Sequence, residues 1–259
     1  MNPFSKFLSP LSSLFQRQPR VILYFSPHQD DELLTLGIDG CRMLQKGYEI
    51  HVILCSDGSK SGIRKKLADG KSCPHHPGIH EYDLDIPAFI AARDLEFRES
   101  CAGLGYETGH VHISAIRAVD GELSVQQGEA ILRETLSRFP GDVSVRTISP
   151  FGGKKQHKDH THLGQAAMNL YQKGLIKDLR LFIEPYCLES CREAYPQLKL
   201  TTIRADGAVT AALKKAIAAY SLWAPREGRY AIGYHSVTTV FKDFLAAPAA
   251  YCHQPQKKQ

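Results

Sequence analysis

Two segments rich in histidine and carboxylate side chains are the part of this chain best suited to chemistry. The first is HQDDE at residues 28–32, and the second is HKDH at residues 157–160. Two imidazoles and one carboxylate form a common catalytic zinc set, which leaves a coordination position open for water. His28 and Asp31 are three residues apart, so both can point at one ion from a tight turn, and His160 can complete the set. The two segments therefore predict a site for a catalytic divalent metal.

The groups left over in these segments are those that hydrolysis needs besides a metal. Asp30 is a carboxylate able to act as a base toward water, and His157 is an imidazole able to act near the oxygen and the leaving nitrogen. A single aspartate at a strand–helix junction is more often a helix N-cap. Two adjacent carboxylates beside a histidine repel one another, however, and a metal would relieve that repulsion.

The elements around the first segment predict a parallel sheet. An apolar run at residues 21–25 reads as a buried strand, and residues 33–47 have the apolar spacing of a helix that ends at a glycine. Residues 50–55 then form a second buried strand. Strand, helix and strand in this order make a right-handed unit with parallel strands.

The rest of the chain continues this alternation and predicts one three-layer α/β domain with a mostly parallel sheet. Polar segments follow three of the strands directly, and the carboxyl ends of parallel strands share one edge, where the site of such a fold lies. A further strand is expected over residues 236–241. The other expected strands are 111–113, 145–148 and 181–184, and the other expected helices are 87–104, 126–139, 160–173 and 210–220.

Residues 59–85 form a long segment with little periodicity, which predicts a functional or mobile loop. Its cations suit a solvated loop, or a lid that binds an acidic group of the substrate. Its cysteine and histidines could hold a second metal, but their proline and glycine neighbours favour an exposed loop. The cations are Arg64, Lys65, Lys66 and Lys71, and the second group is Cys73, His75, His76 and His80.

Composition narrows the classes of partner. The chain has 259 residues, 43% of them hydrophobic and 23% charged, with a formal charge of +5 that is not gathered into one block. These values fit a globular protein and favour a small-molecule substrate over nucleic acid. Seven cysteines without a CxxC pair fit reduced thiols and a cytoplasmic protein. The oligomeric state is not indicated.

The ends of the chain are expected to lie outside the main domain. We expect an N-terminal extension over residues 1–19, the catalytic domain over 20–250 and a tail over 251–259. Apolar residues recur at helical spacing within residues 1–17 and could rest on a membrane surface. Docking of this segment on its own domain is the favoured interpretation, and no run of 18 apolar residues predicts a transmembrane helix.

The two segments resemble a known family. HQDDE resembles the HPDDE signature of the GlcNAc deacetylases of the phosphatidylinositol-glycan and LmbE type, and HKDHTHLG at residues 157–164 resembles their HPDHxxxG segment. SDG at 56–58 resembles the Thr-Asp-Gly turn after the second strand of that family. Arg93 and Glu96, with Leu-Gly closing the same helix, resemble its RxxE…LG helix. The resemblance covers residues 20 to 185.

This resemblance implies a Rossmann-like fold with zinc or another divalent metal held by His28, Asp31 and His160. Asp30 matches the general base and His157 matches the imidazole that stabilises the oxyanion or protonates the leaving amine. Two further positions carry over: Asp159 as a residue that orients a histidine, and Arg93 either as a contact to substrate hydroxyls or as half of a helix salt bridge. Gln29 stands where the family has proline, which should loosen the turn, and Lys158 replaces a second proline.

The function implied is removal of an N-acetyl group from an amino sugar or its conjugate. The alternatives are an amidase that cleaves a larger acyl or thiol conjugate and a catalytically inactive sugar-binding module. A nucleotide-binding domain is disfavoured, because the first strand–helix junction has no GxGxxG and its acidic residues would repel a pyrophosphate. His235 could present an imidazole to the sugar, or it could lie in a turn before the strand at 236–241.

Overall fold

The computed structural model describes residues 21–256. The segment expected to dock or to touch a membrane, residues 1–17, lies outside this range. Among the helices that are described, none is long and apolar enough to cross a membrane.

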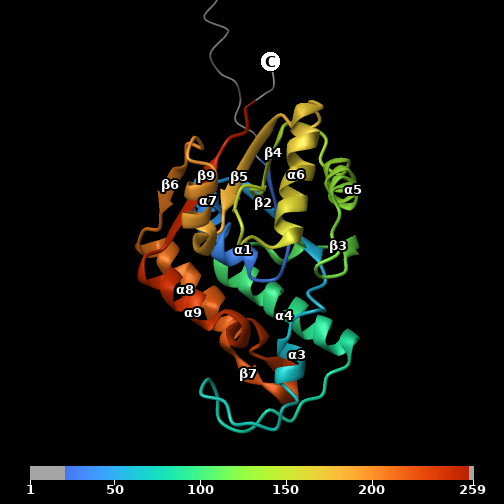
Figure 1. Ribbon diagram of the computed structural model, residues 1–259, viewed down its shortest axis with the longest axis vertical. Helices are drawn as coiled ribbons and strands as arrows, with labels where there is room; N and C mark the ends of the chain where they lie inside the picture. The colour runs from blue at the N-terminus through green and yellow to red at the C-terminus, as the bar shows by residue number, and fades with distance from the viewer. Residues whose placement is uncertain (1–20, 257–259) are drawn as a thin grey trace, which may run out of the picture.

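A seven-stranded sheet forms the centre of the molecule (Figure 1). Its order is β3-β2-β1-β4-β5-β9-β6, with β1 to β5 parallel and β9 antiparallel to both of its neighbours. The inner strands are almost entirely buried because helices cover both faces of the sheet. The strands are β1 (Val21–Ser26), β2 (Glu49–Ser56), β3 (Val111–Ala118), β4 (Val143–Ile148), β5 (Asp178–Ile183), β6 (Thr201–Arg204) and β9 (Ala249–His253).

Helices pack on the two faces of the sheet over separate hydrophobic cores, so the expected three-layer α/β fold is confirmed. α5 and α6 cover one core, and α2, α4, α8 and α9 cover the other. The helices are α1 (Asp31–Leu34), α2 (Gly37–Gln45), α3 (Ile63–Lys66), α4 (Ile86–Leu104), α5 (Val125–Leu136), α6 (Lys158–Gln172), α7 (Leu188–Ala194), α8 (Gly207–Ser221) and α9 (Ile232–Ala246).

Several helix ends follow directly from local sequence. Asp85, Ser124 and Asp206 cap α4, α5 and α8, because each side chain accepts a hydrogen bond from the backbone N–H three residues on. Gly105 ends α4 with a φ of 93°, a left-handed conformation that glycine adopts without strain.

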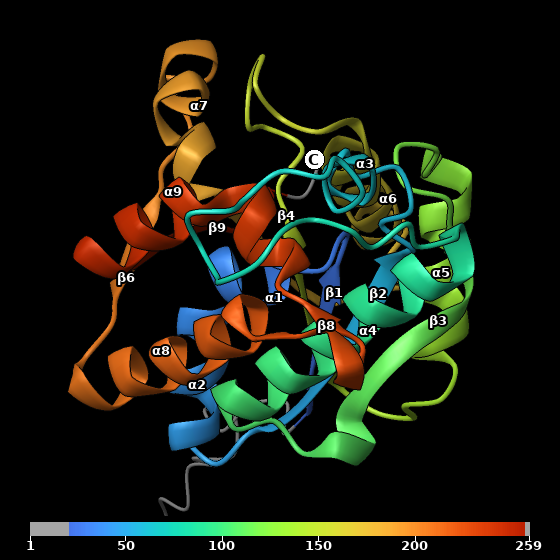
Figure 2. The ribbon, with the colours of Figure 1, turned by 90° about the horizontal axis from the view of Figure 1, so that it is seen from below.

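The segment between α3 and α4 has little regular structure of its own. It lies against the start of α9 and the small two-stranded sheet made by β7 (Trp223–Ala224) and β8 (Arg229–Tyr230), as both ribbon views show (Figures 1 and 2). The prediction of a long loop over residues 59–85 is confirmed except for the short helix α3.

Two predictions about secondary structure are wrong. The helix expected over 33–47 is divided, because α1 ends at Leu34 and α2 begins at Gly37. The strand expected over 236–241 lies inside α9, where Val237 forms a kink with φ −132° and ψ 34°. In addition, β9 runs to His253 and so includes residues that the sequence placed in a C-terminal tail.

The sheet has its topological switch point at β1, where the strand order reverses. β1 pairs with β2 on one side and with β4 on the other, so the chain reverses its direction of winding there. In open α/β sheets, ligands bind outside the carboxyl ends of the strands at such a point. Residues 28–32 lead from β1 into α1, and residues 157–160 form the start of α6 after the loop that follows β4, so the fold brings the two predicted segments to one place.

Candidate metal centre and active site

The loop after β1 makes a strained turn at Asp30. This residue has a φ of 109°, a left-handed value that aspartate tolerates better than most side chains but that still costs about 1–3 kcal/mol. Its backbone N–H donates to the Glu32 carboxylate at 2.9 Å, and its carbonyl accepts from Leu33 and Leu34. The turn therefore places Asp30 immediately before the first residue of α1, Asp31.

The three predicted metal ligands converge. His28 Nδ1 lies 2.9 Å from His160 Nε2, and Asp31 Oδ2 lies 3.0 Å from the same nitrogen. His28 Nδ1 and Asp31 Oδ2 are 3.7 Å apart. Asp31 and His160 are buried, although they come from opposite sides of the switch point. Two nitrogens and one oxygen of the expected set thus face a common centre.

The outer atoms of the two imidazoles contact carboxylates. His160 Nδ1 lies 2.5 Å from Glu184 Oε1, and His28 Nε2 lies 3.1 Å from Asp159 Oδ2 and 3.3 Å from Asp120 Oδ1. An ionised carboxylate only accepts, so these outer nitrogens carry the protons and the inner nitrogens present lone pairs. Two lone pairs and a carboxylate oxygen facing one centre repel each other unless a cation lies between them, which is a good fit to a divalent metal.

The electrostatics of the centre favour positive charge. Burial works to lower the pKa of His160, but the carboxylates of Asp31 and Glu184 outweigh it and raise that pKa to about 9. Burial works in the opposite direction on Asp31, whose pKa the neighbouring His160 and His28 hold well below its usual range. The centre therefore attracts either a proton or a metal ion.

Asp30 has different surroundings from its neighbour. Burial, and then the charge of the Asp31 carboxylate, raises the pKa of Asp30 to about 7. A divalent cation at the adjacent ligands would lower this value, so the Asp30 carboxylate would be ionised at neutral pH. The two aspartates are thus distinguished by their environments, with opposite shifts of their pKa values.

His157 and Asp159 flank the converging ligands. His157 is exposed and caps α6, since its Nδ1 accepts from the backbone N–H of Asp159 at 3.2 Å. Its ring meets that of His28 edge-on, with centroids 4.6 Å apart. Asp159 is buried and accepts from the backbone of Gly121 and Leu123 as well as facing His28. Asp159 therefore fixes both the loop after β3 and the orientation of one ligand.

Arg93 and Gln29 hold the loops behind the centre. Arg93 is buried and donates to the carbonyls of Gly58 at 2.9 Å and Gln29 at 3.1 Å. The Gln29 amide in turn donates to the Asp57 carbonyl at 3.3 Å and to Asp94 Oδ1 at 3.0 Å. A Cβ at Gly58 would lie within 2.8 Å of both side chains, so this turn requires glycine. Side-chain hydrogen bonds thus secure the turn that the loss of proline was expected to loosen.

Two residues predicted to bind substrate lie elsewhere. Arg64 is on α3, where it donates to the Leu84 carbonyl at 3.1 Å. His235 is buried on α9 beside Cys73 and His80, and burial lowers its pKa to about 4. The described structure gives neither side chain a contact with His28, Asp31 or His160.

Sequence reasoning missed Glu184 and Asp120. Glu184 directly follows β5 and Asp120 lies just after β3, so both share the sheet edge that carries the centre. The available signal was position alone, namely a carboxylate at the carboxyl end of a strand. Including them, all five parallel strands β1 to β5 deliver loop residues to this edge.

Comparison with protein families identifies the family of this chain. The family model described as GlcNAc-PI de-N-acetylase matches residues 23–171, which is more than half of the 259 residues. The chain belongs to this family. The matched range contains His28, Asp31 and His160 and leaves out Glu184 and His235. No curated protein matches this chain.

Solved structures share its fold at low sequence identity. A deacetylase triple mutant of the teicoplanin biosynthetic pathway has a TM-score of 0.62 and 17% identity, covering 92% of this chain and 99% of that chain. The N,N'-diacetylchitobiose deacetylase from Pyrococcus horikoshii has a TM-score of 0.57 and 15% identity, covering 88% and 77%. A 4-carboxy-2-hydroxymuconate hydratase from Pseudomonas putida has a TM-score of 0.56 and 16% identity, covering 92% and 98%.

Proposed function

We propose that this protein is a metal-dependent N-deacetylase that acts on an N-acetylated amino sugar or its conjugate. The observation that carries the proposal is the convergence of His28 Nδ1, Asp31 Oδ2 and His160 Nε2 beside a second, differently placed carboxylate. Family membership and the deacetylase names of two structural neighbours point the same way.

In this proposal His28, Asp31 and His160 hold a divalent metal, for which zinc is the best match to two imidazoles and one carboxylate. The ion, when bound, supplies a Lewis acid that polarises the amide carbonyl and makes water more acidic. Glu184 and Asp159 orient the two imidazoles by accepting from their outer nitrogens.

Asp30 is the proposed general base. Its carboxylate takes a proton from the attacking water while Asp31 remains committed to the metal. The strained φ of 109° supports this division, because strain of this kind persists where the surrounding structure holds a functional group in place. His157, at the exposed end of the centre, is placed to stabilise the oxyanion or to donate a proton to the leaving amine.

Recognition of the sugar is assigned to a groove that begins just past Glu184. Its walls combine aromatic rings, which suit the apolar face of a sugar, with one carboxylate. The residues that line it include Pro185, Tyr186, Val240, Asp243, Phe244 and Tyr251. Arg93 is assigned to loop positioning, since its guanidinium is engaged by two backbone carbonyls.

The test measures amide cleavage directly, because a hydratase shares the same fold. Zinc-loaded protein is incubated with a panel of N-acetylated amino sugars and conjugates, and both acetate and the free amine are quantified. Longer N-acyl and thiol-conjugate substrates in the same panel separate a deacetylase from a broader amidase. Equal release of acetate and amine, lost with Asp30→Asn, supports the proposal. No cleavage of any substrate by metal-loaded protein would refute it.

A further inference from the structure

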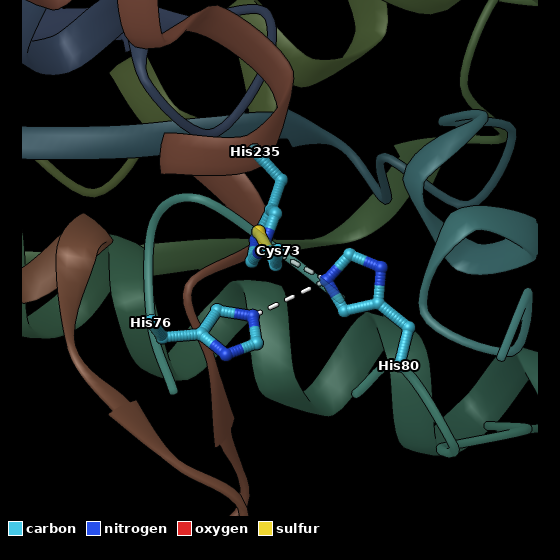
Figure 3. Close-up of side chains that lie close together, drawn as sticks. All are labelled: Cys73, His76, His80 and His235. Atoms are coloured by element: carbon cyan, nitrogen blue, oxygen red, sulfur yellow. Dashed lines mark hydrogen bonds between the residues drawn. The ribbon is translucent and has the colours of Figure 1, made fainter. Parts of the chain in front are cut away.

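A second cluster of metal-ligating side chains lies apart from the centre just described. Figure 3 shows Cys73, His76 and His80, from the segment between α3 and α4, pointing toward His235 of α9. Cys73 Sγ lies 3.2 Å from His235 Nε2, and His80 Nε2 lies 3.2 Å from both His235 Nε2 and His76 Nε2. All four ligand atoms lie within 4.8 Å of one another.

The hydrogen bonds of the rings fix which nitrogens face the centre of this cluster. His235 Nδ1 lies 2.6 Å from the Ala231 carbonyl, and His76 Nδ1 lies 3.0 Å from the Pro77 carbonyl. A carbonyl only accepts, so both Nδ1 atoms carry the protons and both Nε2 atoms present lone pairs. His80 Nδ1 makes no hydrogen bond within the described residues, but it lies 3.4 Å from the Asp69 carboxylate, whose negative charge favours a proton on this nitrogen. Three imidazole lone pairs and a sulfur therefore meet at one point.

These distances match a tetrahedral ion better than direct hydrogen bonds. Zinc–nitrogen bonds of about 2.0–2.1 Å place the nitrogens of a tetrahedron about 3.4 Å apart, close to the separations observed here. Thiolate and imidazole are ligands that zinc prefers, and four protein ligands leave no position open for water. A thiolate and three neutral imidazoles leave a single positive charge on the zinc complex, and the Asp69 carboxylate is placed to offset it.

The surroundings make the cluster rigid and largely dry. His76, His80 and His235 are buried, and Trp223 stacks on the His76 ring with centroids 3.4 Å apart. The start of α9 is itself anchored, because the Glu96 carboxylate accepts from the backbone N–H groups of Ile232 and Gly233. His235 is therefore held in position from a side independent of the segment that carries the other three ligands.

We propose that Cys73, His76, His80 and His235 bind a structural zinc ion that fastens the segment between α3 and α4 to α9. Apart from an isolated bridge between Ser72 and Ile79, residues 67–85 form no helix or strand, so this segment needs a fastening of this kind. The ion has no part in the deacetylation proposed above. It determines where the cations of α3 are held.

Cobalt spectroscopy on the full chain tests the proposal. The catalytic set His28, Asp31 and His160 contains no sulfur, so a thiolate-to-cobalt charge-transfer band in the near ultraviolet reports the second site alone. We expect the wild-type protein to bind two cobalt ions per chain and to show the band. Cys73→Ser should lose the band and one ion. Cobalt-loaded wild-type protein without the band would overturn the proposal, whether or not the catalytic set is loaded.

Matched variants distinguish the loss of a metal ligand from general destabilisation of the fold. Cys41→Ser is the control for the cysteine, because Cys41 Sγ donates to the Leu104 carbonyl and serine can do the same. His75→Ala is the control for His76→Ala, since His75 is in the same segment but outside the four ligands. Both controls should keep the band and both ions, whereas His76→Ala should weaken or abolish the band. Loss of the band in both histidine variants alike would contradict the assignment.

A third measurement needs no variant. Of the seven cysteines, all within the described residues, Cys73 is the half-buried one and the rest are buried. Zinc at the proposed site should protect the Cys73 thiolate from alkylation in the native protein, and removal of zinc should expose it. An alkylation rate that is the same with and without zinc would show that Cys73 is not a zinc ligand and would overturn the proposed site.

Discussion

Replacing Asp30 and Asp31 separately should divide catalysis from metal binding. Asparagine keeps the size of either side chain and removes the charge. At Asp30 it also accepts the left-handed φ of 109°, so Asp30→Asn should fold normally. At Asp31 the lost charge is the one that contacts both His28 and His160.

The expected effects differ in kind. Removal of a positioned general base costs about 10²–10⁴ in rate, or about 2.7–5.5 kcal/mol of transition-state stabilisation, so Asp30→Asn should lose kcat to this extent and keep its metal. Asp31→Asn removes a direct ligand and should weaken metal affinity by more than the ~10–100-fold that loss of an outer partner costs. Excess metal should restore part of its activity.

The assay pairs two measurements on each variant: metal content by elemental analysis and kcat from acetate release at saturating metal. Asp30→Gly serves as a further control, because glycine removes both the base and the strain. It should raise the free energy of unfolding by about 1 kcal/mol while losing activity. If Asp30→Asn loses the metal while Asp31→Asn keeps it, the two roles are reversed. Full activity and full metal in both variants would refute the whole site.

Three further outcomes are expected. Glu184→Gln should raise the dissociation constant for zinc ~10–100-fold, measured against a competing chelator, while Glu189→Gln, whose side chain is 78% exposed, should leave it unchanged. Arg146→Met should lower the free energy of unfolding by about 3–5 kcal/mol in denaturant titrations, because it leaves the buried Asp39 charge unpaired, and adding Asp39→Leu should recover most of the loss. Arg64 has no contact with the metal ligands in the described structure, so replacing Arg64, Lys65 and Lys66 of α3 with alanine should raise KM for an acidic substrate without lowering kcat. A fall in kcat alone would contradict the prediction that these cations form a lid over the substrate.

The site residues that could be predicted from the sequence are those that follow the ends of predicted strands. HQDDE follows an apolar run that predicts a buried strand, and HKDH comes after the loop that follows another, so topology brings His28 and His160 together. Glu184 could not be singled out in the same way, because one carboxylate after a strand is commonplace. Its role depends on the 2.5 Å contact with His160, which only the folded sheet creates.

Only part of the second cluster could be predicted from the sequence. Cys73, His76 and His80 are close in the chain, but their fourth partner lies 155 residues beyond His80, and nothing local connects them. The β-branched run after His235 also favoured a strand, whereas packing of Phe241 and Phe244 into the core imposes a helix. The β-branched run begins at Val237, and this is the residue at which α9 is kinked.

The position of β9 has a consequence for how this protein is made. Of the described strands β9 is the last to be synthesised, yet it lies between β5 and β6 and is the sheet partner of both. At about 5–20 residues per second, the outer edge of β5 waits several seconds, while residues 184–253 are synthesised, before its neighbour exists. An unpaired edge of a buried strand is a template for aggregation. Translation that stops short of Ala249 would therefore leave β5 and β6 without the strand that joins them, so the described sheet closes only after residues 249–253 have been made.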